Sequence, residues 1–193
     1  PVTTNTLDDN FRENWTIIKK YPVPIWQPGM NTQSRNLIVA VNLIHQFPRS
    51  WIDGIFIIED DDYYTPEYLD EMVNKLHGYD VIGQGNTVYY NVPKQGFKIN
   101  NNVNHSSLFQ TGFTIDALPI FESCFSSRFI DIAFFQTTLN KNVFIQEKQL
   151  AVGIKGLLGR NGIGMGHRMR NPKLDYKYNV LKALLGDDYK YYI

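Results

Sequence analysis

Apolar positions along the chain recur at helical spacing in some stretches and form short continuous runs in others, and together these patterns predict an α/β protein. Over residues 33–47 the apolar positions recur at helical spacing. Residues 55–58, Ile-Phe-Ile-Ile, form a short apolar run typical of a strand buried on both faces. A second helix is expected to open at Thr65, and residues 79–83 are expected to form the next strand. This order of elements predicts a mixed but mainly parallel sheet flanked by helices.

The pattern weakens in the second half of the chain but still indicates alternating strands and helices. Further strands are expected at residues 87–92, 97–99, 108–115, 143–146 and 150–155, and helices at residues 127–139 and 173–185. The length of 193 residues fits one compact domain better than two.

Composition excludes some classes of protein. Lys and Arg total 19, as do Asp and Glu, so the chain lacks the basic surplus of a general nucleic-acid binder. The single cysteine, Cys124, excludes an intramolecular disulfide. No apolar run approaches the roughly 18 residues of a membrane span, and no signal peptide opens the sequence. We therefore expect a cytoplasmic protein without a membrane span.

Four consecutive acids, Glu59 to Asp62, follow the apolar run at residues 55–58. Their mutual repulsion is unfavourable unless a cation neutralises it. Open α/β sheets bind ligands at the carboxyl ends of their strands, and hard divalent cations prefer carboxylate oxygens and bridge to substrate phosphates. The cluster predicts a Mg²⁺ or Mn²⁺ site that holds a diphosphate. The alternative is a solvated acidic turn before the next helix.

The stretch from Ile57 to Leu69, IIEDDDYYTPEYL, resembles the DxD region of family-two glycosyltransferases with the GT-A fold. Upstream, Ser34-Arg35-Asn36 followed by Ala40 resembles the element that begins the preceding helix in that family. The resemblance implies a GT-A-like, Rossmann-like fold. The family's first nucleotide-binding strands have no clear counterpart here, so either the N-terminal part is abbreviated or nucleobase binding is rebuilt from other residues.

The resemblance also implies an activity and a division of the chain. It implies a metal-dependent, inverting transfer of a sugar from a nucleoside-diphosphate sugar, a UDP-sugar, to an acceptor hydroxyl. Residues 1–193 would form one catalytic domain. About residues 1–90 would bind the nucleotide-sugar and the metal, and about residues 91–193 would supply the acceptor half and a glycine-rich lid.

The family's pattern assigns roles to the acids. Asp61 is expected to be the main metal ligand, with Asp60 and Asp62 as alternatives. Glu59 and Asp60 are expected to contact the ribose or the sugar, and Arg35 is expected to lie near the nucleotide-sugar.

Asp131 is the candidate catalytic base, because in the family an acid at the start of a helix beyond the acceptor-side strand takes the acceptor's proton. An acid among so many apolar residues also has an environment that raises a pKa. The alternative is an aspartate on the polar side of an amphipathic helix. Gln110 and Thr111, on the expected acceptor-side strand, are candidates for hydrogen bonds to the acceptor.

A glycine-rich segment at residues 153–168 is the second informative feature. Lys155 and Arg160 are expected to help its backbone N–H groups hold phosphate. His167 is the candidate for a further metal ligand, as in many GT-A enzymes, and the glycines favour a closing lid. The alternative is a flexible basic surface loop.

Two other functions remain open from the sequence. The acceptor is either a saccharide or, as in small enzymes that glycosylate hydroxymethylated DNA bases, a modified DNA base. Outside this chemistry, the acids also fit a nucleotidyltransferase or a non-catalytic nucleotide-binding module.

Overall fold

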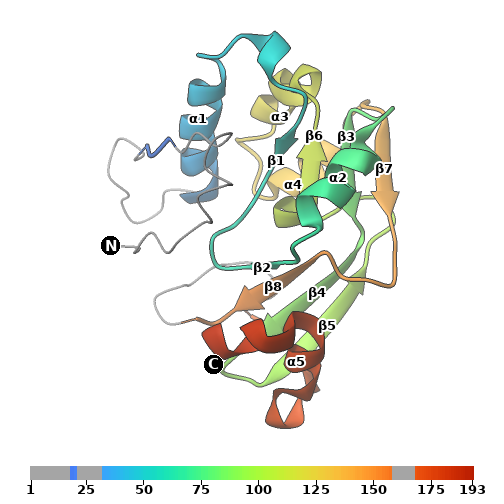
Figure 1. Ribbon diagram of the computed structural model, residues 1–193. Helices are drawn as coiled ribbons and strands as arrows, with labels where there is room; N and C mark the ends of the chain where they lie inside the picture. Colours follow the sequence, from blue (N-terminus) through green and yellow to red (C-terminus); the bar gives the residue numbers. More distant parts are fainter. Residues whose placement is uncertain (1–17, 21–31, 158–167) are drawn as a thin grey trace, which may run out of the picture. The chain divides into compact units, whose positions relative to one another are not determined.

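The computed structural model describes residues 18–20, 32–157 and 168–193 (Figure 1). The chain divides into two compact units, Pro1–Gln46 and Phe47–Ile193. In the first unit, helix α1 spans Thr32–Ile44 and confirms the helix expected at residues 33–47, although it ends three residues earlier. None of the helices in the described ranges combines the length and the apolar character that a membrane crossing requires.

The second unit contains two sheets. The four-stranded sheet has the order β1-β6-β3-β7, with bounds Ile55–Phe56, Thr111–Phe113, Val81–Gln84 and Lys141–Phe144. The five-stranded sheet has the order β2-β8-β4-β5-β9, with bounds Tyr63–Tyr64, Ala151–Lys155, Asn86–Asn91, Gly96–Asn101 and Lys173–Leu174. The expected α/β class is confirmed, and a GT-A architecture stays a prediction.

The expectation of a mainly parallel sheet was wrong. Among the described strands, only β3–β7 and β4–β8 pair in parallel, whereas the other five pairs are antiparallel. The connection between β4 and β5 shows why. Asn91 pairs with Gly96, so residues 92–95 form a tight hairpin turn, which is far too short for the crossover that parallel strands need.

The expectation that residues 55–58 form a strand buried on both faces was also wrong. β1 lies at the edge of its sheet, is only half-buried, and ends at Phe56. Ile57 donates one more backbone hydrogen bond to Thr111, at 3.0 Å, and the Ile58 residue is 53% exposed. The chain leaves the first sheet here and enters the second at β2, so the four acids connect the two sheets.

The helices are shorter than expected. α2 spans Tyr68–Leu76, so it begins three residues after Thr65, and α4 spans Ile130–Phe135 rather than residues 127–139. The tail expected to be helical from residue 173 opens with strand β9, and α5 covers only Asn179–Leu185. The remaining helical elements are α3 at Leu118–Ser123 and the 3₁₀ turns at Arg49–Trp51, Leu108–Gln110, Ile115–Ala117, Tyr176–Tyr178 and Gly186–Tyr191.

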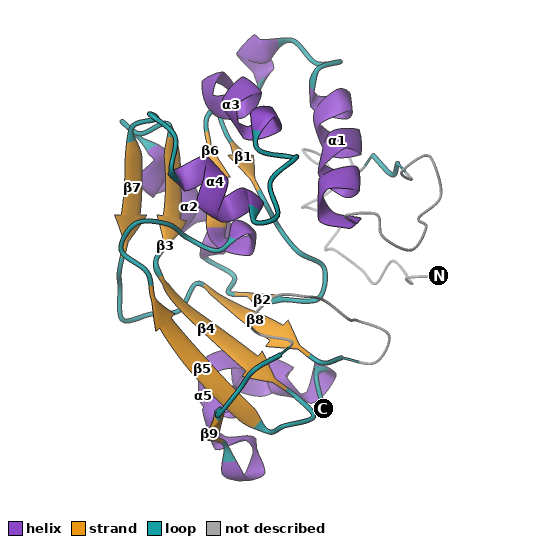
Figure 2. Ribbon diagram, turned by 180° about the vertical axis from the view of Figure 1, so that it is seen from behind, coloured by secondary structure: helices purple, strands orange, loops and turns teal. Residues whose placement is uncertain are grey.

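Helices cover both faces of the four-stranded sheet (Figures 1 and 2). Met72 and Leu76 of α2 pack in one apolar cluster with Ile82 of β3. On β6, the ring of Phe113 contacts Phe121 of α3 and Phe134 of α4. Because neighbouring strand positions alternate between faces, these two clusters occupy opposite sides of the sheet.

One face of the five-stranded sheet is covered by α5, whose Leu181 and Leu185 pack with Val88, Tyr90, Val152 and Ile154. Alternation along the strands therefore directs Tyr89 of β4, and Gly153 and Lys155 of β8, to the opposite face. That second face is where the chain brings the acids.

Candidate metal centre

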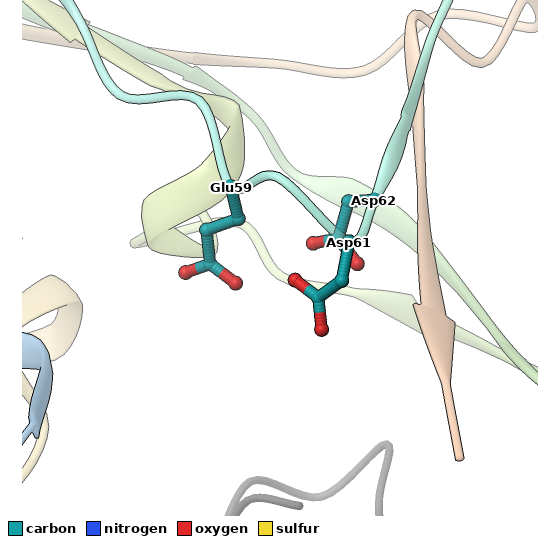
Figure 3. Close-up of side chains that lie close together, drawn as sticks. All are labelled: Glu59, Asp61 and Asp62. Carbon is teal, nitrogen blue, oxygen red and sulfur yellow. The ribbon is translucent and has the colours of Figure 1, made fainter. Parts of the chain in front are cut away.

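Glu59, Asp61 and Asp62 gather their carboxylates in one place (Figure 3). One oxygen from each lies within 4.8 Å of the other two. A local turn brings them together, since the Asp62 N–H donates to the Glu59 carbonyl at 3.3 Å. A turn of this kind places the first and fourth side chains near each other.

Asp62 is the most constrained member of the cluster. Its side chain is fully buried, and its Oδ1 accepts hydrogen bonds from the Ile154 N–H at 2.9 Å and from Lys155 Nζ at 2.7 Å. Both donors belong to β8, and the pairing of Tyr63 with Val152 brings that strand beside the acids. Its Oδ2 is equally buried and has no hydrogen-bond partner among the described residues. A buried, unpartnered carboxylate oxygen is costly, and a bound cation would satisfy it.

The electrostatics of the site follow from this burial. Burial raises the pKa of Asp62 to about 7, against the opposing effect of Lys155, and the negative charge of Glu59 raises it further. Burial alone would lower the pKa of Lys155, but the carboxylates of Asp62 and Glu59 outweigh it and raise that pKa. Lys155 therefore stays charged at neutral pH, beside a carboxylate that binds protons more readily than an exposed one.

Glu59 is held from two sides. Its Oε2 lies 3.8 Å from Lys155 Nζ, and its backbone N–H donates to the Tyr64 hydroxyl at 2.8 Å. That hydroxyl in turn donates to the Phe109 carbonyl at 3.2 Å. The acidic turn is thus tied both to β8 and to the core.

The structure brings together a slightly different set of acids from the one expected. Asp61 and Asp62, predicted as metal ligands, lie in the cluster, whereas Asp60 is not one of its three members. Glu59, predicted only as a sugar or ribose contact, takes its place. The sequence feature that could have identified Glu59 as a ligand is its position three residues before Asp62. In a turn, residues with this spacing lie close together, whereas in a continuing strand they do not.

Asp131 lies in the first turn of α4. The Tyr89 hydroxyl lies 2.7 Å from Ser107 Oγ. Burial raises the pKa of Tyr89, and the negative charges of Asp131, Asp62 and Glu59 add to that rise. The charges of Asp131 and of the acid cluster therefore both raise the pKa of the Tyr89 hydroxyl.

Burial also raises the pKa of Asp131 itself, while the Ile132 N–H and the charge of His105 oppose the rise. A carboxyl group with a raised pKa is better suited to accepting a proton than an exposed one. The role of Asp131 as a catalytic base stays a prediction.

Gln110 and Thr111 lie in the core. Both side chains are fully buried; Gln110 donates to Gln84 Oε1 at 3.3 Å, and Thr111 donates to the Ser107 carbonyl at 3.0 Å. Gln110 also donates to the Ala151 carbonyl of β8 at 3.4 Å and so links the two sheets. We do not carry Gln110 or Thr111 into the proposed site as acceptor contacts.

The other predicted site residues lie elsewhere in the chain. Arg35 belongs to α1 in the first unit, so its contact with a nucleotide-sugar stays a prediction. Arg160 and His167, with most of the glycine-rich segment, lie outside the described residues.

A surface pocket of about 370 Å³ lies beside the start of β1 and the end of α2, lined by residues that include Asp53, His77, Asp80 and Thr114. None of the four consecutive acids lines it. We place the candidate chemistry at the acid cluster instead, because the unpartnered Asp62 oxygen lies there.

Comparison of the chain with protein-family models, with curated proteins and with solved structures finds no match. The function is therefore argued from the geometry of the site and from the sequence pattern.

Proposed function

We propose that the chain is a metal-dependent glycosyltransferase that binds Mn²⁺ or Mg²⁺ through Glu59, Asp61 and Asp62. The observation that supports this most directly is the buried Oδ2 of Asp62, which belongs to a group of three carboxylates and lacks a hydrogen-bond partner among residues 18–20, 32–157 and 168–193. Oxygen ligands of this type suit hard divalent cations.

The cluster is buried on one side and open on the other, as a diphosphate site requires. The Asp62 side chain is fully buried, the Glu59 side chain is 31% exposed, and Asp61 is half-buried. Three carboxylates leave coordination positions for phosphate oxygens and water on the open side. When bound there, a divalent cation would neutralise the charge that develops on a departing nucleoside diphosphate. A UDP-sugar is the proposed donor.

Asp131 is the proposed base for the acceptor hydroxyl, in an inverting transfer. Two observations support it: Asp131 lies in the first turn of α4, and burial raises its pKa. In this proposal the carboxylate of Asp131 takes the proton of the attacking hydroxyl.

Thermal unfolding with Mn²⁺, with UDP, and with both together tests the metal and nucleotide sites. We expect Mn²⁺ alone to raise Tm, by about 5 °C or more at about 100 times its Kd, and UDP to add to the rise only when Mn²⁺ is present. Asp61→Asn should remove both effects. Asp70→Asn, an exposed acid on α2, is the matched control and should keep them. A wild-type Tm unaffected by Mn²⁺ would contradict the proposal.

A second assay separates the classes of function. UDP-sugars labelled in the sugar are incubated with saccharide acceptors in one arm and with hydroxymethylated DNA in the other. Transfer of the label identifies the acceptor class. A nucleotidyltransferase would instead release pyrophosphate from a nucleoside triphosphate, and a binding module would bind UDP without turnover of any donor.

A further inference from the structure

Lys155 ends strand β8 with a side chain that is only 7% exposed. Lysine is almost never buried to this extent unless it is paired. Its Nζ lies 2.7 Å from Asp62 Oδ1, 3.8 Å from Glu59 Oε2 and 5.7 Å from the centre of the Phe109 ring. Two of its near neighbours are thus the carboxylates of the proposed metal centre.

The backbone fixes this ammonium in place. In the parallel pairing of β4 with β8, Asn91 lies opposite Lys155, and the Val92 N–H donates to the Lys155 carbonyl at 3.0 Å. The preceding residue, Ile154, donates its N–H to the same Oδ1 of Asp62 that accepts from Lys155. The two donors satisfy one oxygen of Asp62, and the other, Oδ2, has no partner in the part of the chain that the structure describes.

The net charge of the cluster indicates what Lys155 contributes. Three carboxylates and one ammonium leave a formal charge of minus two, which one divalent cation neutralises. Without the ammonium, the fully buried Asp62 carboxylate would lie beside two partly buried carboxylates with no positive charge to offset them, which disfavours the folded state.

We infer that Lys155 is a built-in counter-cation, which keeps the acid cluster folded when no metal is bound and weakens the binding of the metal that the cluster accepts. The inference rests on the proposed function, because it requires a cation at Glu59, Asp61 and Asp62. It makes Lys155 a positioning residue that acts through Asp62. The sequence predicted a different role for Lys155, a contact with phosphate. Loss of a counter-cation should change Mn²⁺ affinity, whereas loss of a phosphate contact should change UDP binding.

The positive charge of Lys155 affects metal-free stability and metal affinity in opposite directions. The ammonium attracts the carboxylates, so its loss destabilises the metal-free protein. It also repels a divalent cation bound to the same carboxylates, so its loss strengthens metal binding. A residue with only a packing role would lower stability and leave metal affinity unchanged.

The test compares the wild type with Lys155→Met, Lys155→Gln and Lys155→Arg, using Tm in EDTA and in Mn²⁺ together with Mn²⁺ titration calorimetry, all without nucleotide. For the Met and Gln variants we expect a lower Tm in EDTA, a larger Tm rise with Mn²⁺, and about tenfold tighter Mn²⁺ binding. The Arg variant keeps the charge and should resemble the wild type.

Lys141→Met is the matched control, because the ammonium of Lys141 is held by backbone carbonyls, including that of Thr137 at 3.1 Å, rather than by carboxylates. It should lower Tm equally in EDTA and in Mn²⁺.

The outcomes separate this inference from the proposed function. If Mn²⁺ shifts the Tm of no variant, the metal site itself is wrong. If Mn²⁺ stabilises the wild type but stabilises Lys155→Met and Lys155→Gln no more strongly, the counter-cation role is wrong. A separate titration with UDP in saturating Mn²⁺ tests the phosphate role: weaker UDP binding by the neutral variants, with unchanged Mn²⁺ affinity, would contradict the counter-cation role and favour a phosphate contact. Failure of both neutral variants to fold even in saturating Mn²⁺ would also overturn the inference, since the metal should replace the missing charge.

Discussion

The hydroxyl of Tyr64 accepts a hydrogen bond from the backbone N–H of Glu59 at 2.8 Å. The same hydroxyl donates to the carbonyl of Phe109 at 3.2 Å. One phenol therefore connects the acidic turn to the core, and it fixes where Glu59 stands relative to Asp62. The metal centre depends on this connection as well as on its own carboxylates.

Tyr64→Phe should weaken Mn²⁺ binding several-fold, because Glu59 loses its tie to the core and is less well positioned. It should also lower the free energy of unfolding by about 1 kcal/mol through the lost hydrogen bonds. Mn²⁺ titration calorimetry and urea unfolding measure the two effects.

Tyr68→Phe is a close control, since the Tyr68 hydroxyl donates to the same Phe109 carbonyl, at 3.3 Å, without a hydrogen bond to the acidic turn. It should cost similar stability and leave Mn²⁺ affinity unchanged. Equal Mn²⁺ affinities in the two variants would show that Tyr64 does not position Glu59.

Asp61→Asn and Asp62→Asn should both abolish the Mn²⁺ shift but differ in metal-free stability. Asp61 is half-buried, so its replacement should change the free energy of unfolding by no more than about 0.5 kcal/mol. Asp62 is fully buried against Lys155, so its replacement should change the free energy of unfolding more, by about 1–3 kcal/mol. The lost partner of Lys155 lowers stability, and removal of a buried carboxylate with a raised pKa offsets part of that loss. Urea unfolding in EDTA distinguishes the two variants, and equal changes would contradict the assigned burial and pairing.

Part of the fold was predictable because short runs of β-branched and other apolar residues favour buried strands. Val81 and Ile82 of β3, and Val152 and Ile154 of β8, were expected in strands and lie buried there. The position of β1 at the edge of its sheet was not predictable from the sequence. An apolar run of four residues looks the same in a central strand and at a crossing between two sheets, and only the pairing partners distinguish the two.

The acid cluster itself was predictable from its sequence, but its internal arrangement was not. Glu59 joins Asp61 and Asp62 because the chain turns at residues 59–62, and the pattern did not show that turn. Lys155 was expected to bind phosphate because it opens a glycine-rich segment. Its contact with Asp62, 93 residues away in the chain, depends on the register of β2 against β8, which local sequence does not encode.

Asp131 should make stability depend on pH. Burial raises its pKa in the folded protein above the unfolded value of about 3.9. The folded state therefore favours the protonated form, and this contribution to stability is present at low pH and is lost as pH rises through the raised pKa. Asp131→Asn should be more stable than the wild type at neutral pH, by a margin that shrinks in acid, and should lose sugar transfer.

Thermal unfolding across the acidic to neutral range measures this difference, with Asp116→Asn as the control. The Asp116 side chain is 86% exposed and pairs with the exposed Arg49, so its replacement should leave the pH dependence of the wild type in place. A constant gap between wild type and Asp131→Asn at every pH would contradict the raised pKa.

Asp175 should hold α5 on the five-stranded sheet without contributing to the metal centre. The residue is 3% exposed, and its carboxylate accepts from the Tyr90 hydroxyl at 2.9 Å and from the N–H groups of Val180 and Leu181. Asp175→Ala leaves these buried donors unpartnered and should lower the free energy of unfolding by about 2–4 kcal/mol. The Mn²⁺-induced rise in Tm should persist, because α5 covers the face of the sheet opposite to Lys155. Urea unfolding and thermal shift test both parts, and loss of the Mn²⁺ response in a folded Asp175→Ala protein would show that the two faces are coupled.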